Sequence, residues 1–370
     1  MRKCLEIIWK SGGITKPGLA VQSGLTPVTA HKFINELFEI GIVSETGVSD
    51  AQLGKKALVY GINPGYGCFI GVNIYNRVIT ASAFDFRMKA LHVETGPFPG
   101  EYSEAAFDML CAAASGLIAR AGRPILGIGV TLSGPIDFQR GIAMNCMDMK
   151  GWNNIPLKQM LEKRLGIPAV VENDVNASSI ALKWLMAPKN CFAFVGISSG
   201  VGIGLMVNNE VYRGPNSNAG ELGHATITPR GKLCRCGNRG CIEEYVSDDG
   251  ILEESGCASL DDVVAEARKG SPAVQEVLRN KCEYIAILLD FVVKAYDPNV
   301  IYLNSEWMNR LPQYFGMLSD AVYAKSQWLG RERLDIALLE RFDEPLQAVK
   351  GPAYAIFDNY LNNGCFKQAQ

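Results

Sequence analysis

Four side chains that bind metals well lie close together near the middle of the chain, in the segment GHATITPRGKLCRCGNRGCIEE at residues 223–244. Their order and spacing are His224-x9-Cys234-x-Cys236-x4-Cys241. One imidazole and three thiolates form a ligand set that Zn²⁺ prefers, and the glycines between them let the loop turn around an ion. A disulfide between Cys234 and Cys236 is the alternative, but it would be strained and is disfavoured in a reducing compartment.

We therefore predict that this loop binds Zn²⁺ through all four side chains. The segment is polar and has few residues for a core of its own, so the metal would supply much of its folding free energy. Because four protein ligands leave no position open for a substrate, we expect the ion to be structural rather than catalytic.

The overall composition is that of an ordinary globular protein. Of 370 residues, 48% are hydrophobic and 20% are charged, and the net charge of −2 does not indicate nucleic-acid binding. Most of the eleven cysteines stand alone in apolar surroundings, which indicates reduced thiols. The N-terminus lacks the pattern of a signal peptide, and no apolar run reaches the ~18 residues of a membrane helix. We expect a cytoplasmic protein that does not insert into a membrane.

The length suggests two or three structural units, and the first of them is small and helical. Apolar residues at helical spacing predict a first helix that ends at Gly12-Gly13, while Thr15 and Thr26 are typical caps for a second and a third helix. Two strands, around GIVSE and KKALVYGIN, then form a hairpin. This order predicts a winged helix-turn-helix DNA-binding domain at residues 1–62.

The third helix of this domain would enter the DNA groove. We predict DNA contacts from the start and the outer face of that helix and from the wing, at Thr26, Val28, His31, Lys32, Lys55 and Lys56. A small protein-interaction domain with solvated charges is the alternative. Seven basic and five acidic residues give residues 1–62 a charge of only +2, so the prediction depends on the order of the elements rather than on charge.

The rest of the chain alternates strands and helices. The segments CFIGVNIYNRVITASAFD and CFAFVGISSGVGIGLMVN align as strand, turn and strand, which indicates a duplicated unit. We predict one α/β lobe at residues 63–185 and a second at 186–370, the second with the zinc loop and with a C-terminal helix that can pack back on the first lobe. Two such lobes resemble the ribonuclease-H-like fold of actin and sugar kinases, in which a cleft between the lobes binds the ligand.

The motifs GELGH and CRCGNRGCIE resemble the signature of the ROK family (repressor, open reading frame, kinase). Further matches are LSGPID at 132–137, GWNNIPL at 151–157 and ENDVNA at 172–177, and the N-terminal domain resembles that of the repressor branch. The resemblance implies a set of sugar contacts, namely Asn173, Asp174, Glu221, His224 and Glu243. Asn173 and Asp174 could instead cap the helix that follows them, and Glu221 could pair with a lysine.

The nucleotide half of the cleft departs from the kinase pattern. Kinases of this fold have Asp-x-Gly-Gly-Thr at the first hairpin turn, where glycines admit phosphate and the acid helps to place the metal. This chain has Asn73-Ile74-Tyr75-Asn76-Arg77 there. It also has Ser198-Ser199 where the kinases have Gly-Thr, and Asn304-Ser305 where they have a pair of glycines. We therefore expect no catalytic residue, with Asp174 as the vestige of the kinase's general base.

These features together predict a sugar-responsive transcriptional repressor of carbohydrate metabolism. A homodimer or dimer of dimers would place two winged helices on operator DNA, and a sugar in the cleft would change the spacing between them. An ATP-dependent sugar kinase is the alternative from another class, and a regulator whose input is a sugar-transport protein is a third.

Overall fold

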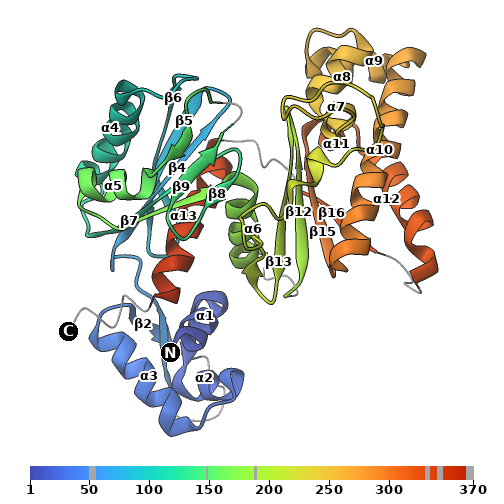
Figure 1. Ribbon diagram of the computed structural model, residues 1–370. Coiled ribbons are helices and arrows are strands. Elements are labelled where there is room, and N and C mark those ends of the chain that lie inside the picture. The colour runs from blue at the N-terminus through green and yellow to red at the C-terminus, as the bar shows by residue number, and fades with distance from the viewer. Residues whose placement is uncertain (50–55, 147–148, 187–189, 330–333, 340–344, 364–370) are drawn as a thin grey trace.

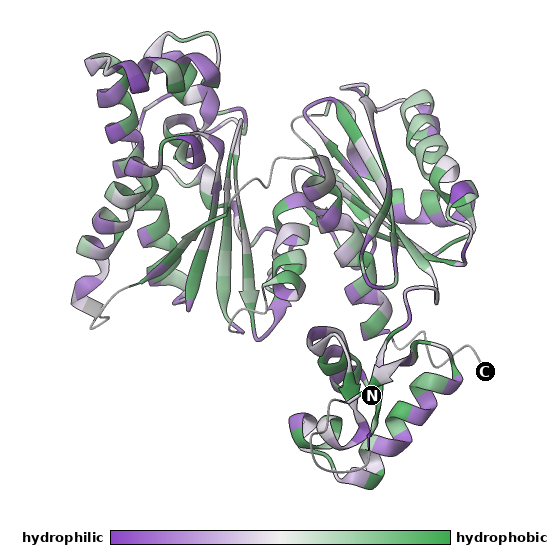
Figure 2. Ribbon diagram, turned by 180° about the vertical axis from the view of Figure 1, so that it is seen from behind, coloured by the Kyte–Doolittle hydropathy of each residue, from purple (hydrophilic) through white to green (hydrophobic). Residues whose placement is uncertain are grey.

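The computed structural model describes residues 1–49, 56–146, 149–186, 190–329, 334–339 and 345–363. A small N-terminal body lies below two α/β lobes that stand side by side (Figure 1). Strands of both lobes are mainly hydrophobic, whereas the helices on the outside carry both hydrophilic and hydrophobic residues (Figure 2). Among the helices of the described residues, none combines the length and apolar character that a bilayer crossing needs.

Three helices and a small antiparallel sheet form the N-terminal body. Its elements are α1 (Arg2–Ser11), β1 (Ile14–Thr15), α2 (Lys16–Ser23), α3 (Pro27–Glu39), β2 (Val43–Val48) and β3 (Leu58–Ile62), with β3 between β1 and β2. The hydroxyls of Thr15 and Thr26 each accept a hydrogen bond from the backbone N–H three residues later, and so cap α2 and α3 as expected. Gly24 ends α2 with a φ of 72°. The strand β1 was not foreseen. The tip of the hairpin, including Lys55, is outside the described residues.

The first lobe is built on a mixed five-stranded sheet in the order β11-β7-β4-β5-β6. Its elements are β4 (Cys68–Tyr75), β5 (Val78–Asp85), β6 (Ala90–Pro97), α4 (Glu104–Arg120), β7 (Ile125–Leu132), α5 (Leu157–Leu165), β11 (Ala169–Asn173) and α6 (Asp174–Leu185). The helices α4 and α5 cover one face of the sheet, and α6 with the C-terminal helix α13 (Pro345–Asn362) covers the other. A small sheet of β8 (Ile136–Asp137), β9 (Ile142–Asn145) and β10 (Asn153–Ile155) was not predicted.

The second lobe also begins with a β-hairpin, as the first does. Its five-stranded sheet has the order β14-β13-β12-β15-β16. Its strands are β12 (Phe192–Ile197), β13 (Val201–Val207), β14 (Glu210–Val211), β15 (Val300–Ser305) and β16 (Asp335–Leu338). Its helices are η1 (Glu221–His224), α7 (Glu243–Val246), α8 (Asp248–Ser255), α9 (Leu260–Lys269), α10 (Pro272–Tyr296), α11 (Glu306–Arg310), α12 (Pro312–Ser326) and η2 (Gln327–Leu329). The helices α8, α9 and α10 were not predicted.

Helix α6 lies between the two lobes (Figure 1) and packs against α13 on one side and β12 and β13 on the other. The approach is close because two glycines of β13 face it: a Cβ atom at Gly202 or Gly204 would collide with Val175 or Ser179 of α6. On the other side, α13 lies directly against Gly71 of β4 and Gly129 of β7. The chain therefore returns from the second lobe to complete the first.

The N-terminal body is docked on α6 and α13 through an aromatic cluster. The ring of Trp9 lies 4.9 Å from that of Phe357 and 6.0 Å from that of Trp184. The carboxylate of Asp358 accepts hydrogen bonds from Lys183 Nζ at 2.6 Å and from Trp184 Nε1 at 3.0 Å. Its Oδ1 is also 3.9 Å from a guanidinium nitrogen of Arg2, so one carboxylate links α13, α6 and α1.

Candidate functional site

A cavity of about 220 Å³ opens between the two lobes. This volume is below the ~300–1,000 Å³ of pockets for drug-sized ligands, and it suits a small molecule such as a monosaccharide. The five residues predicted to contact sugar all line it: Asn173, Asp174, Glu221, His224 and Glu243. The first two come from the first lobe and the other three from the second, so a ligand in this cavity would touch both lobes.

Asn173 and Asp174 stand at the N-terminal end of α6. The Asn173 side-chain oxygen accepts hydrogen bonds from the backbone N–H groups of Val175 and Asn176, both at 3.1 Å, so its capping role is real. Its Nδ2 donates to the carbonyl of Gly134 at 3.1 Å. Asp174 accepts a hydrogen bond from Ser133 Oγ at 2.9 Å, which holds this carboxylate at the cavity wall. Ser133 is a site residue that the LSGPID motif could have indicated.

Glu221 and Glu243 have different environments on the opposite wall. Desolvation of the Glu221 carboxyl group raises its pKa, and the nearby carboxylates of Asp174 and Glu243 add to this shift while His224 opposes it. The residue as a whole is exposed to solvent. Glu243 is buried, and it accepts hydrogen bonds from Val201 N–H at 2.9 Å and from Arg235 Nε at 3.0 Å. It therefore ties the start of β13 to the cysteine loop, and Arg235 is a lining residue that the sequence analysis missed.

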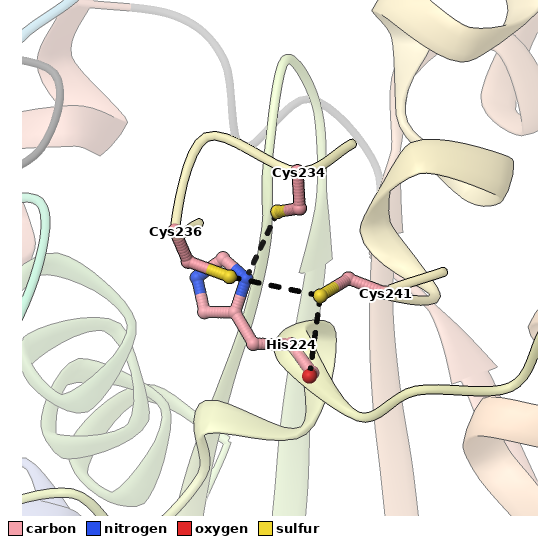
Figure 3. Close-up of side chains that lie close together, drawn as sticks. All are labelled: His224, Cys234, Cys236 and Cys241. Carbon is pink, nitrogen blue, oxygen red and sulfur yellow. Dashed lines mark hydrogen bonds between the residues drawn. The ribbon is translucent and has the colours of Figure 1, made fainter. Parts of the chain in front are cut away.

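His224, Cys234, Cys236 and Cys241 converge on one point beside the cavity (Figure 3). Cys234 Sγ is 3.5 Å from His224 Nδ1, and Cys236 Sγ is 3.6 Å from Cys241 Sγ. A tetrahedral ion with bonds of ~2.3 Å to sulfur and ~2.0 Å to nitrogen would separate its ligands by about 3.5–3.8 Å. The sulfur atoms are too far apart for a disulfide, and the four ligand atoms fit a metal ion.

The hairpin turns of the two lobes also meet at the cavity. The hydroxyl of Tyr75, at the end of β4, lies 2.7 Å from Ser198 Oγ and 2.8 Å from Ser199 Oγ in the turn after β12. Residues Asn76 and Arg77 make the β4–β5 turn with φ angles of 48° and 59°, without the glycines of a phosphate-binding turn. The space between the turns is thus closed by side chains.

A second contact between the lobes lies away from the cavity. The Arg213 guanidinium, just after β14, forms an ion pair with Glu172 of β11, whose side chain is only 1% exposed. The same guanidinium is 3.8 Å from the centre of the Phe138 ring. No local pattern predicts this contact, because its partners are far apart in the chain.

The predicted DNA-contacting residues that are described lie on the surface of the N-terminal body. Val28, which is 81% exposed, follows the start of α3, and His31 and Lys32 lie one turn further on the exposed face. The hydroxyl of Thr26 caps α3, and Lys56 is exposed just before β3.

The fold and the cleft define a two-lobed α/β protein of the actin and sugar-kinase type, with a small helical body docked on it. The chain belongs to the ROK family, whose model matches residues 69–326.

Relatives of two kinds are similar to this chain. The xylose repressor of Bacillus spizizenii is 26% identical over 87% of this chain and 85% of its own length. A ROK family transcriptional regulator, described as a homologue of the E. coli MLC protein, covers 99% of this chain and 98% of its own with a TM-score of 0.84 and 21% identity. A ROK hexokinase from Thermus thermophilus covers 80% of this chain and 100% of its own, with a TM-score of 0.70 and 26% identity.

Proposed function

We propose that this protein is a sugar-responsive transcriptional repressor. Its N-terminal body acts as a winged helix-turn-helix that binds operator DNA, and a sugar effector binds in the cleft between the lobes. The surface position of Val28, His31 and Lys32 supports the first assignment. The carboxylates and amides that line the cleft support the second, because such groups hydrogen-bond sugar hydroxyls.

One observation carries the proposal: helix α6 connects the two sites. Its N-terminal end holds Asp174 in the cleft, and its C-terminal end holds Trp184 against Trp9 of the N-terminal body. A sugar that favours one arrangement of the lobes would shift α6 and so change the position of the DNA-binding body. To act, the sugar must bind one arrangement more tightly than the other.

The cysteine loop would hold a structural Zn²⁺ ion through His224, Cys234, Cys236 and Cys241. Bound zinc supplies folding energy to the loop and fixes the ring of His224. The loop in turn carries Arg235, which pairs with Glu243 at the cleft. A bound ion would therefore stabilise the wall of the effector site through Arg235 and Glu243, in a structural role.

The experiment that tests the repressor function starts from a pool of random DNA duplexes. The full-length protein should select a specific sequence, and a mobility-shift assay with that sequence should respond to one member of a panel of sugars. A single sugar should change the operator affinity by ~5–150-fold, the usual range of allosteric coupling. If no specific DNA is selected, or if no sugar changes its affinity, the proposal is wrong.

An ATP-dependent sugar kinase is the second candidate, because Asp174 keeps the position of a general base in the cleft. We propose that this activity is absent, since side chains close the space between the two hairpin turns. Protein with Mg²⁺, ATP and each sugar should produce no sugar phosphate. ATP-dependent product that is lost in Asp174→Asn would establish the kinase instead.

A further inference from the structure

The phenol of Tyr75 bridges the two lobes at the wall of the cleft. It extends from the end of β4 in the first lobe and shares hydrogen bonds with Ser198 and Ser199 of the second. Burial raises the pKa of Tyr75 above its ordinary value, although the hydrogen bonds with Ser198 and Ser199 act against this shift. The phenol therefore stays protonated over the physiological pH range. The neutral side chain of Tyr75 thus fills the space between the β4–β5 turn and the turn after β12.

We propose that the cleft takes an unphosphorylated monosaccharide, and that Tyr75 imposes this restriction by filling the space beside Asp174. The inference rests on the proposed sugar-binding function and makes its ligand class specific. Tyr75, Asp174 and Ser198 line the same cavity, and the Asp174 carboxylate is close enough to the phenol to contribute to its raised pKa. A group that extends from Asp174 toward the turns therefore meets the phenol.

The shape of the cavity supports this restriction. A sugar whose hydroxyl hydrogen-bonds to Asp174 would direct any phosphate ester on that hydroxyl toward the phenol and its two serine partners. The tyrosine ring and a phosphoryl group cannot occupy that space together. A phosphate ester could enter only by breaking both hydrogen bonds that join the lobes through Tyr75.

The charges around the cavity also disfavour a phosphate ester. Among the described lining residues, the acidic side chains are Asp174, Glu221 and Glu243, and the basic ones are Arg235 and His224. Arg235 is paired with Glu243, so its charge is already compensated. A phosphate dianion would therefore face like charges, whereas hydroxyl groups can donate hydrogen bonds to these carboxylates.

Calorimetric titration of the full-length protein tests the proposal. The probes are D-xylose, D-glucose, D-mannose and N-acetyl-D-glucosamine, with the 6-phosphate of each hexose. We expect at least one free sugar to bind, and its 6-phosphate, where it has one, to bind more than about tenfold more weakly, equivalent to ~1.4 kcal/mol.

Variants at Tyr75 separate the space that the ring fills from the hydrogen bonds that it makes. Tyr75→Ala opens this wall of the cavity, so the affinity ratio of a free sugar to its phosphate should shrink at least about fivefold. Tyr75→Phe keeps the ring and should keep the ratio. Tyr212→Phe, a matched change outside the cavity lining, should alter neither affinity. Tyr75→Ser is a second small variant if the alanine variant does not fold.

A sugar phosphate that binds the wild type as tightly as its parent sugar would overturn the proposal, and so would a folded Tyr75→Ala with an unchanged ratio. If every sugar and every ester fails to bind, the proposed sugar-binding function is itself wrong, and this inference is lost with it.

Discussion

At the scale of single residues, Asp174 is the most informative position, because its carboxylate faces the cleft from the first turn of α6. The change Asp174→Asn keeps the shape, and the cap of α6 comes from Asn173. The lost charge-assisted hydrogen bond should weaken sugar binding by ~1.5–3 kcal/mol, more than tenfold, while operator binding without sugar stays normal.

Sugar titrations of the operator complex measure this effect. The control is Asp108→Asn, which changes an exposed carboxylate paired with Arg164 on the outside of the first lobe. An unchanged half-saturating sugar concentration in the Asp174 variant would show that Asp174 does not contact the sugar.

The cysteine cluster gives a second prediction for single residues. The purified protein should contain about one zinc ion per chain, and Cys236→Ser should lower metal affinity by more than the ~10–100-fold typical of an outer-shell partner. Thermal stability and the sugar response should fall together, because the loop positions Arg235 and Glu243. Cys257→Ser, outside the cluster, is the control. Elemental analysis that finds no metal in fresh wild-type protein would contradict the assignment.

At the scale of elements, α3 is expected to read the DNA. His31→Ala should lower operator affinity by ~1–3 kcal/mol if it contacts a base edge, and Lys32→Ala should reduce the salt dependence of binding by about one phosphate contact. Both side chains are exposed, so the melting temperature should not change. Lys10→Ala, an exposed lysine at the end of α1, is the matched control. Normal operator affinity in both α3 variants would refute the assignment of this face.

The contact between α1 and α6 predicts how the sugar signal is transmitted. Trp9→Ala removes two ring contacts, each worth ~0.5–1.5 kcal/mol, and should leave sugar affinity intact. The effect of sugar on operator affinity should shrink at least about fivefold, since the N-terminal body is no longer fixed to α6. Hydrogen exchange checks that the body stays folded, and Trp328→Ala, an exposed tryptophan of the second lobe, is the control. Full sugar response in folded Trp9→Ala would exclude this route.

At the scale of the whole molecule, we expect operator recognition to require two copies of the chain. We expect a particle of at least twice the 40.3 kDa chain mass, and a footprint of two half-sites separated by a whole number of helical turns of 10–10.5 base pairs. Light scattering and footprinting measure both. A monomer bound to a single half-site would contradict the expected assembly.

The sequence was most informative where function depends on neighbouring residues. Spacing was enough to bring His224 and the three cysteines together, and the threonine caps placed the helices of the N-terminal body. The sequence did not predict contacts between segments that are far apart in the chain. The departure of Tyr75 from the kinase pattern is visible in the sequence, but the hydrogen bond between its hydroxyl and Ser198, 123 positions away, is not. Such contacts depend on how the lobes pack, which no local pattern encodes.

The return of α13 to the first lobe has a consequence for protein synthesis. The sheet of the first lobe emerges from the ribosome early, but the helix that covers one of its faces is translated only after the whole second lobe. That same helix supplies Phe357 and Asp358, against which the N-terminal body docks. A nascent chain therefore carries the N-terminal body long before it has the surface that orients this body. Competence to repress a gene is acquired only when the last helix has been translated and has packed into place.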